Sequence, residues 1–288
     1  MISTQLSTYR LSAVDLLNQR YDLNAVISEI REHIMDLNGT AVIVTGGASG
    51  LGASTARAMA ASGAKVTIFD INADAAQEVA SEIGGVGVGC DVSSSDATEA
   101  AISAAREAHG AVRVLVNCAG IGPPGRTVSR RGPLPLDDFR RIIEVNLIGT
   151  FNCARLVAAE MLELDPVNED GERGVIVNTS SVAAYDGQIG QPAYSASKGG
   201  IASLTLPMAR EFASKGVRVM TVAPGLFATP LMFSLPDEAQ KALGESVPFP
   251  SRLGTADEFA SMVLYICNNR MLNGEVIRLD GALRMAPK

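Results

Sequence analysis

From Thr40 onward, short runs of apolar residues alternate with longer segments in which apolar residues recur at helical spacing. The apolar runs predict strands at 41–45, 65–69, 86–90, 112–116, 174–178, 217–222 and 274–278. The helical patterns predict helices near 51–62, 73–83, 95–109, 136–164, 193–214 and 255–268. Continuous apolar strands separated by helices indicate a parallel sheet, covered on both faces and joined by right-handed crossovers. We therefore predict an α/β fold, a doubly wound sheet of about seven parallel strands.

Residues 1–36 do not follow this alternation. Ser12 and Asp15 match a capping box, and apolar residues recur at helical spacing over 26–34, which predicts two short amphipathic helices. The acidic residues of the segment disfavour a mitochondrial transit peptide, and the apolar core of a signal peptide is missing. We predict a helical appendage followed by a single domain over 37–288. The appendage either packs on its own or a neighbouring subunit or binds a dedicated partner.

A glycine-rich turn, Thr45-Gly46-Gly47-Ala48-Ser49-Gly50-Leu51-Gly52, joins the first predicted strand to the first helix of the domain. Glycines let the backbone turn sharply and approach a ligand, and the free N–H groups of the following helix suit a pyrophosphate. Asp70 ends the second strand, where a carboxylate accepts hydrogen bonds from ribose hydroxyls and repels a 2′-phosphate. The pattern predicts NAD in preference to NADP. The alternative is a purely structural strand–turn–helix.

Further candidates follow the carboxyl ends of other strands, where ligands bind in parallel sheets. Asp91 and Val92 are placed for an adenine edge, and the small-residue turn 117–120 is placed for the nicotinamide ribose. Each signal is weak alone, because Asp and Asn-x-x-Gly are also common in turns. Their position at the strand ends is what favours a binding role.

One pair of residues suggests proton transfer. Tyr194 follows Ser181 by thirteen residues, and Lys198 stands four residues later on the same predicted helix face. A cation nearby favours the phenolate and can lower a pKa by roughly 1 to 3. We expect Tyr194 to exchange a proton with an alcohol, Ser181 to bond the same oxygen, and Asn146 to anchor a water that orients Lys198. Taken alone, Tyr-x3-Lys is a common surface pair.

Composition narrows the partners of this 288-residue chain. Its net charge of −7 argues against nucleic acid, and no run reaches ~18 apolar residues, so no membrane span is expected. His33 and His109 are not placed for a catalytic triad or a zinc site. The cysteines lack metal-ligand spacing and predict buried thiols, a reducing compartment, a cytoplasmic location and no metal. They are Cys90, Cys118, Cys153 and Cys267.

Two predicted loops differ in what they offer. The loop 121–135 carries Arg126, Arg130 and Arg131, which either contact the phosphates of a large substrate or are simply solvated. The polar loop 165–172 is predicted to be a surface excursion without chemistry.

Together these motifs resemble the short-chain dehydrogenase/reductase superfamily over residues 37–288. The resemblance implies a Rossmann-type fold and a catalytic set of Asn146, Ser181, Tyr194 and Lys198. It also rests on Pro224-Gly225 and implies nicotinamide contacts near Val222, Pro224 and Thr229. The expected cofactor-binding residues are Gly46, Ser49, Gly50, Leu51, Gly52, Asp70, Asp91, Val92, Asn117, Ala119, Gly120, Tyr194, Lys198, Pro224, Gly225 and Thr229.

Within that superfamily, the segments 187–191, 247–254 and 273–281 resemble the type II 3-hydroxyacyl-CoA dehydrogenases, also described as 17β-hydroxysteroid dehydrogenase type 10. This resemblance implies NAD-dependent oxidation of 3-hydroxyacyl-CoA thioesters and a place in fatty acid metabolism. It also implies a substrate lid between Gly225 and Gly254, whose apolar residues either suit an acyl chain or serve plain packing. The lid's expected members include Leu226, Phe227, Leu231, Met232, Phe233 and Leu235.

The resemblance also implies a homotetramer in which the helices carrying Asn146 and Tyr194 pair between subunits. The small residues Ala196, Gly199 and Gly200 permit such close approach. The appendage and the proline-rich loop 121–135 depart from the family pattern, which leaves two alternatives. One is a dehydrogenase of a steroid, aromatic or other hydrophobic non-CoA alcohol. The other is a catalytically silent NAD-binding scaffold subunit.

Overall fold

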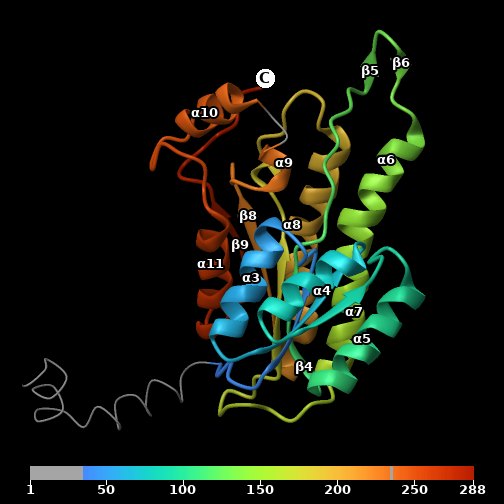
Figure 1. The fold of residues 1–288 in the computed structure, drawn as a ribbon, viewed down its shortest axis with the longest axis vertical. Coiled ribbons are helices and arrows are strands. Elements are labelled where there is room, and N and C mark those ends of the chain that lie inside the picture. Colours follow the sequence, from blue (N-terminus) through green and yellow to red (C-terminus); the bar gives the residue numbers. More distant parts are fainter. Residues whose placement is uncertain (1–34, 234–235) are drawn as a thin grey trace, which may run out of the picture.

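The structure, a computed structural model, describes residues 35–233 and 236–288 (Figure 1). The predicted helices of the appendage lie outside the described residues. Met35 and Leu37 are buried in the core, so the packed domain begins no later than Met35.

The predicted doubly wound sheet is confirmed. Seven parallel strands are arranged in the order β3-β2-β1-β4-β7-β8-β9, and each lies within two residues of its predicted ends. A right-handed alternation of strand and helix places all carboxyl strand ends along one edge. The strands are β1 (Ala41–Thr45), β2 (Lys65–Asp70), β3 (Val86–Gly89), β4 (Val112–Asn117), β7 (Gly174–Thr179), β8 (Val217–Pro224) and β9 (Val276–Leu279).

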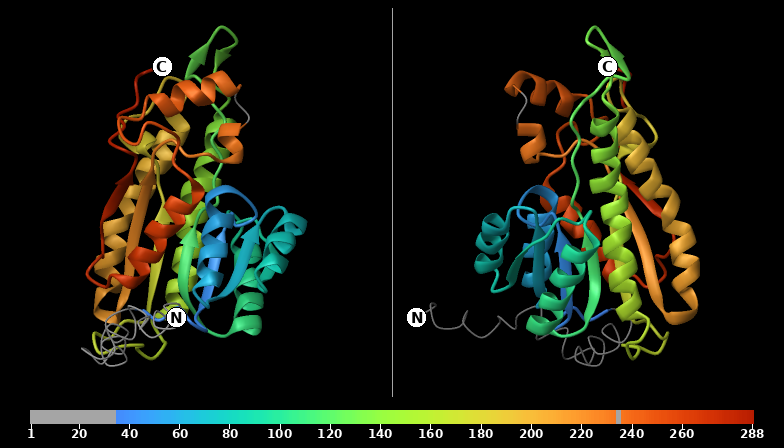
Figure 2. Two further views of the ribbon diagram at one scale, coloured as in Figure 1. Left: turned by 60° about the vertical axis from the view of Figure 1, so that its left-hand side comes forward. Right: turned by 90° about the vertical axis from the view of Figure 1, so that its right-hand side faces the viewer.

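Helices cover both faces of the sheet (Figure 2). The side chains of successive strand residues point to opposite faces, so Val42 and Val44 join one apolar core while Ile43 joins the other. The first core is completed by α3 (Gly50–Ala61), α4 (Ala73–Glu82) and α11 (Ala256–Asn268). The second is completed by α5 (Ser95–His109), α7 (Gly149–Met161) and α8 (Pro192–Phe212).

The single long helix predicted over 136–164 is interrupted. It consists of α6 (Leu136–Ile143), a π-helical segment η1 (Glu144–Ile148) and α7. Such π-helical turns are rare and often occur at functional sites. Here the wider turn surrounds Asn146, whose side chain is fully buried.

Within the described part of the chain, the helical run Leu136–Met161 is long and apolar enough to cross a membrane by length and composition, at a mean hydropathy of 1.3. Half of that segment is buried inside the protein, where α7 packs against β4 and α5. Its apolarity is accounted for by this packing, as in other core helices.

Three short excursions interrupt the regular alternation. The loop 121–135 contains a hairpin of β5 (Val128–Ser129) and β6 (Gly132–Pro133), which projects from the body of the molecule (Figure 1). The region of the expected lid contains α9 (Pro230–Phe233) and α10 (Asp237–Glu245). Leu235 lies outside the described residues, as does the side chain of Leu231. Short 3₁₀ turns, η2 (Val182–Ala184) and η3 (Ala213–Lys215), flank α8.

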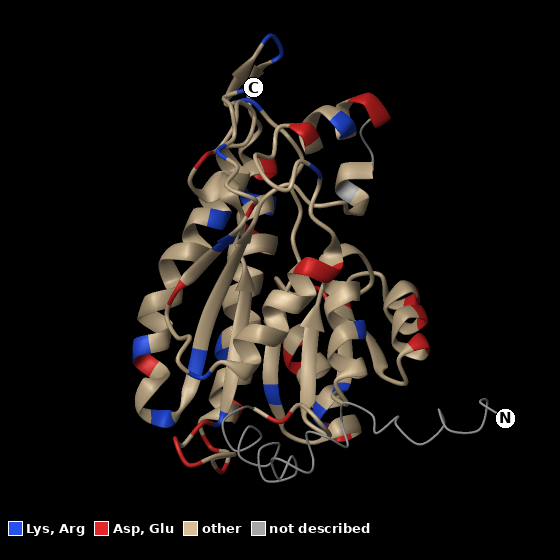
Figure 3. Cartoon of the chain, turned by 90° about the vertical axis from the view of Figure 1, so that its left-hand side faces the viewer, with Lys and Arg blue, Asp and Glu red and all other residues tan. Residues whose placement is uncertain are grey.

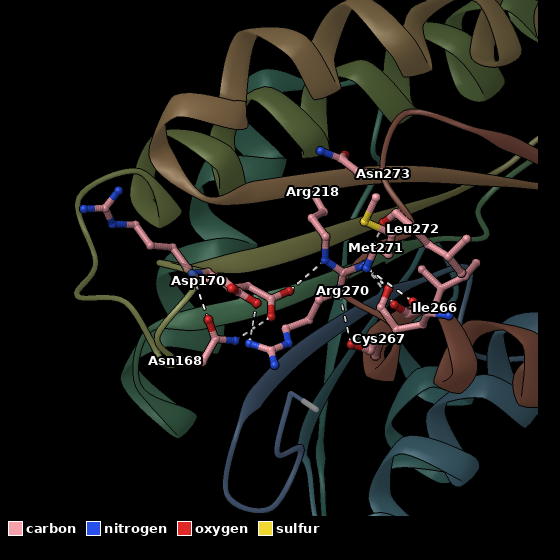
Figure 4. Close-up of polar contacts among 12 residues, drawn as sticks. Asn168, Asp170, Arg218, Ile266, Cys267, Arg270, Met271, Leu272 and Asn273 are labelled. Carbon is pink, nitrogen blue, oxygen red and sulfur yellow. Dashed lines mark hydrogen bonds and ion pairs between the residues drawn. The ribbon is translucent and has the colours of Figure 1, made fainter. Parts of the chain in front are cut away.

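The loop 165–172 is not the simple surface excursion that the sequence predicts. Glu172, at its end, is 4% exposed and forms an ion pair of 2.8 Å with the buried Arg218 at the start of β8 (Figure 4). The same guanidinium donates hydrogen bonds to carbonyl oxygens at the end of α11 and in the turn after it, including Ile266, Cys267 and Leu272. The loop therefore ties the amino end of β8 to α11, because its last acid is needed to neutralise a buried arginine.

Candidate active site

The glycine turn leaves β1 and begins α3. Gly46 and Gly50 have φ values of +62° and +51°, in the left-handed region that favours glycine. A Cβ on Gly46 would lie 2.7 Å from the backbone of Ala119, and one on Gly52 would lie 2.2 Å from the carbonyl oxygen of Gly46. Ser49 precedes α3 without a side-chain capping bond, so the first N–H groups of the helix are available to an anion.

Asp70 ends β2 beside this turn. Its Oδ2 accepts a hydrogen bond from the backbone N–H of Ala48 at 3.1 Å, and its Oδ1 accepts one from Asn72 at 3.0 Å. The carboxylate therefore braces the glycine turn. Because it also lines the cleft described next, it presents a negative charge to any ligand there.

A cleft of about 390 Å³ lies over the carboxyl ends of β1, β2, β3 and β4. It brings together most of the residues that were expected to bind a cofactor. These are Gly46, Ser49, Gly50, Leu51, Gly52, Asp70, Asp91, Val92, Ala119, Gly120 and Thr229. The arrangement of a glycine turn at one helix start, an acid at the second strand end and small residues at the fourth fits a dinucleotide.

Five expected cofactor residues do not line this cleft: Tyr194 and Lys198, which are described in the next paragraph, and Asn117, Pro224 and Gly225. Asn117 is 2% exposed, and its Nδ2 donates to Oδ1 of Asn178 at 2.9 Å, so its side chain ties β4 to β7. Pro224 is buried at the end of β8. A Cβ on Gly225 would lie 2.9 Å from Cα of Asp280, so this glycine serves the close approach of two chain segments.

Tyr194 and Lys198 lie on α8 beyond the inner end of the cleft. The Nζ atom of Lys198 is 5.8 Å from the centroid of the Tyr194 ring and donates a hydrogen bond to the carbonyl oxygen of Thr179 at 2.7 Å. A Cβ on Gly120, in the cleft wall, would lie 3.5 Å from that Nζ. One on Gly122 would lie 3.2 Å from the Tyr194 ring. Two glycines of the segment after β4 therefore lie close to these side chains, and one of them, Gly120, belongs to the cleft wall.

The expected lowering of the tyrosine pKa is not what this structure shows. Burial raises the pKa of Tyr194, and the interaction with Ser181 lowers it by less. Burial also lowers the pKa of Lys198 from 10.5 to about 8. For both groups, the cost of burying the charged form sets the direction of the pKa shift. A further positive charge in the cleft would favour the phenolate.

Ser181 stands between the end of β7 and η2. Its Oγ accepts a hydrogen bond from the backbone N–H of Ala183 at 3.1 Å, which fixes the side chain at the start of that turn. The hydroxyl proton remains available for an acceptor beside Tyr194. Ser181 and Tyr194 can therefore bond one substrate oxygen together.

The expected role of Asn146, to anchor a water that orients Lys198, stays a prediction, and the structure shows its protein partners. Its Oδ1 accepts a hydrogen bond from the N–H of Ile121 at 2.8 Å, and its Nδ2 donates to the carbonyl oxygen of Ile121 at 2.8 Å and to Ser197 Oγ at 3.0 Å. These hydrogen bonds join the segment after β4 to α8. They position Gly120 against Lys198, since a Cβ on Gly120 would also lie 3.2 Å from Oδ1 of Asn146.

A second hollow of about 190 Å³ opens on the other side of Tyr194. Two charged residues of α6, Asp138 and Arg141, share its wall with the tyrosine, and Arg141 also lines the larger cleft. Sequence reasoning did not single out either residue. The signal was available, because 138, 141, 142 and 145 form one face of the predicted helix. The apolar wall consists of Pro123, Pro124, Leu134, Ile142 and Ala193.

The arginines of the loop 121–135 are not placed as expected. Arg130 and Arg131 form the turn of the β5–β6 hairpin, where Figure 3 shows a basic tip far from the sheet. Arg126 lines a separate open hollow beside Gln188 and Gln191. None of the three lines the large cleft or the hollow beside Tyr194. The structure therefore gives no support to a phosphate contact by these arginines at the reaction site.

Comparisons with known proteins agree with this geometry. The short chain dehydrogenase family model matches residues 40–240. The 3-hydroxyacyl-CoA dehydrogenase type-2 of Bos taurus is 50% identical over 255 residues, which are 87% of this chain and 97% of that protein. The crystal structure of 3-hydroxyacyl-CoA dehydrogenase type-2 from Mycobacterium avium superposes with a TM-score of 0.83 at 45% identity, over 87% of this chain and 98% of that one.

A further solved structure is 7 alpha-hydroxysteroid dehydrogenase complexed with NADH and 7-oxo glycochenodeoxycholic acid. It superposes with a TM-score of 0.78 at 32% identity, over 88% of this chain and 97% of that one. The cleft over the sheet and the Ser181, Tyr194 and Lys198 side chains beside it are what such a nicotinamide-dependent oxidoreductase requires. The chain belongs to the short chain dehydrogenase family.

Proposed function

We propose that this protein oxidises a 3-hydroxyacyl-CoA to the 3-oxoacyl-CoA, reversibly, with NAD as the cofactor. The observation that carries the proposal is the pairing of Tyr194 and Lys198 on α8, with Ser181 beside the tyrosine, next to Gly120 in the wall of a cleft suited to a dinucleotide. The substrate is supported by the relatives named 3-hydroxyacyl-CoA dehydrogenase type-2, which this chain matches along almost their whole length.

In this mechanism the protein holds the carbinol oxygen and accepts its proton. Ser181 donates a hydrogen bond to that oxygen, and the Tyr194 phenolate takes the proton as the C=O bond forms. Lys198, held by the carbonyl oxygen of Thr179, supplies a positive charge beside the ring that favours the deprotonated tyrosine. A bound nicotinamide would accept the hydrogen that leaves the carbinol carbon with its electron pair. Each turnover therefore releases one proton, which Tyr194 passes on.

The preference for NAD rests on Asp70. Its carboxylate lies in the cleft wall at the end of β2, where it can accept hydrogen bonds from ribose hydroxyls but repels a 2′-phosphate. We expect Asp70→Ala to weaken the binding of NAD about tenfold, because one charge-assisted interaction is lost. The same change should narrow the preference of the enzyme for NAD over NADP. The measurement is kcat/KM with both cofactors, with the exposed Asp74→Ala as control. An unchanged cofactor ratio would contradict this role.

The second candidate is a dehydrogenase of a steroid or another hydrophobic alcohol without coenzyme A. It is favoured by the apolar wall of the hollow beside Tyr194 and by the loop arginines, which point elsewhere. The structural neighbour that was solved with a bile-acid ligand also supports it. The third candidate function is that of a catalytically silent NAD-binding scaffold, which turnover of any alcohol would rule out.

We further propose that the protein works as a homotetramer in the cytoplasm, as expected from the sequence. Apolar side chains are exposed on η1, α7 and α8, namely Ile148 (46%), Phe151 (46%) and Leu206 (44%), and a Cβ on Gly199 would meet open space. These features support pairing of the helices that carry Asn146 and Tyr194. Light scattering of the wild type and of Phe151→Glu tests it, since the charge would lower the assembled mass.

The experiment that tests the proposed reaction compares three substrates with purified protein and NAD. A short 3-hydroxyacyl-CoA is set beside the matching free hydroxy acid and a hydroxysteroid, and NADH formation is followed by absorbance. We expect a kcat/KM for the thioester well above those of the other two. Turnover of the non-CoA alcohols alone would leave the catalytic residues in place and overturn the substrate.

A further inference from the structure

One face of α6 joins the two hollows on either side of the reaction site. Asp138, Arg141, Ile142 and Val145 stand at positions i, i+3, i+4 and i+7 of this helix and the π-turn that follows it. Asp138 and Ile142 line the hollow beside Tyr194, Val145 lines the dinucleotide-type cleft, and Arg141 lines both. Arg141 is therefore the cation at the junction between the two compartments.

The two neighbouring arginines of α6 are both exposed, but they differ in their partners. Arg140 forms an ion pair of 2.9 Å with Asp137 on the outer face of the helix, where both side chains are exposed. Arg141 makes no hydrogen bond or ion pair with another side chain in 35–233 and 236–288, although Asp138 is one turn away. Its five N–H donors are therefore available to a ligand that enters the hollow.

The hollow itself restricts what that ligand can be. Its wall is apolar except for Asp138, Arg141 and Tyr194, and its volume of about 190 Å³ suits the reacting end of a substrate rather than a nucleotide. An acceptor oxygen beside the reacting carbon would meet a guanidinium there. A carboxylate, Asp138, faces the same space and disfavours additional negative charge.

We propose that Arg141 is a specificity residue that donates hydrogen bonds to the carbonyl oxygen of the substrate's acyl group, while Tyr194 and Ser181 hold its hydroxyl oxygen. The inference rests on the proposed function and adds the residue that distinguishes a 3-hydroxyacyl group from a plain secondary alcohol. A thioester carbonyl accepts such bonds without bringing a charge close to Asp138. In this proposal Arg141 binds the acyl oxygen and not the phosphates of coenzyme A.

The test compares Arg141→Gln with Arg140→Gln, a matched change on the same helix turned away from both hollows. The substrates are a 3-hydroxyacyl-CoA, the same acyl group on pantetheine without the phosphates, and a secondary alcohol without an acyl oxygen. We expect Arg141→Gln to raise KM about tenfold for both thioesters, with kcat changed less than about threefold. The KM of the plain alcohol, the Kd of NAD and all constants of Arg140→Gln should be unchanged.

Several outcomes would overturn the proposal. A KM effect on the CoA thioester alone would assign Arg141 to the phosphates, and a weakened NAD affinity would assign it to the cofactor. An equal loss with all three substrates, or none, would remove its specificity role. A wild-type protein that does not turn over thioesters at all would instead refute the proposed function, so the two failures are distinguishable.

Discussion

Two buried cations lie at opposite ends of the central strands, and their surroundings differ. Arg218, 6% exposed, stands at the start of β8, where Glu172 neutralises it and several carbonyl oxygens accept its hydrogen bonds (Figure 4). Lys198, 4% exposed, lies beside the carboxyl end of β7. Among the described residues its ammonium has one hydrogen-bond acceptor, the carbonyl oxygen of Thr179, and no acidic partner.

The two buried cations differ in how many protein partners offset the cost of burying their charge. Burying a charge costs free energy unless partners replace the water that it loses. Arg218 has these partners, so it holds a loop, a strand and a helix end together. Lys198 lacks them, and its pKa falls to about 8 as a result. We infer that one end of the sheet is built for stability and that the other keeps an undercompensated charge for chemistry.

The largest effect is expected from removing the proton acceptor. Tyr194→Phe should lower kcat about 10³-fold, because the phenyl ring cannot take the carbinol proton, while the Kd of NAD stays nearly unchanged. Steady-state kinetics and calorimetric titration measure both quantities. Tyr265→Phe, on the exposed face of α11, is the matched control. Activity of Tyr194→Phe within tenfold of the wild type would refute the mechanism.

The substitution Arg218→Met removes the buried ion pair with Glu172 at the start of β8. This change leaves Glu172 buried without its cation and several carbonyl oxygens without a donor, so we expect the free energy of unfolding to fall by about 3 to 5 kcal/mol. Urea unfolding measures it. In Arg57→Met, which breaks a half-exposed pair with Glu82, the loss should stay below about 1 kcal/mol. Equal losses in the two variants would show that burial of the pair does not matter.

The smallest effect concerns pH. Burial raises the pKa of Tyr194, so at neutral pH the protonated form dominates and the base form grows as pH rises. The kcat/KM for alcohol oxidation should therefore increase by up to about tenfold per pH unit between about pH 6 and about pH 8. Ketone reduction, which needs the protonated tyrosine, should stay level over the same range, because the tyrosine remains protonated there. A flat profile for oxidation would contradict proton transfer to Tyr194 as the limiting event.

Most of this fold was predicted from local sequence patterns, namely apolar runs and the helical spacing of apolar residues. The strands are continuous apolar runs, and the alternation of Val42, Ile43 and Val44 between two cores follows from the pleat. The glycine turn and the Tyr194–Lys198 pair were predictable for the same reason, since each lies within one turn or one helix face. The appendage lies outside the described residues, apart from its last two.

The features that were not predicted depend on contacts between distant segments. The π-turn contains Asn146, whose side chain bonds Ile121, and the buried Glu172 pairs with Arg218. Neither contact leaves a periodic signal in the chain. The direction of the Tyr194 pKa was also missed, because burial depends on the assembled core. Arg141 was overlooked although its helix face is readable from the sequence, because its place between two hollows depends on the assembled fold.

The measurement that tests the central claim most directly is the stability and turnover of Lys198→Met, a change to an uncharged side chain of similar length. A lysine pKa lowered from 10.5 to about 8 corresponds to roughly 3 kcal/mol of destabilisation below pH 8, which decreases as pH rises toward 10.5. Losing the bond to Thr179 offsets about 1 kcal/mol of the gain.

We therefore predict that Lys198→Met unfolds at higher urea concentration near neutral pH, by about 2 kcal/mol in free energy, while NAD-dependent alcohol oxidation is lost. A variant that is both less stable and still active would contradict the claim that this charge is kept for the reaction.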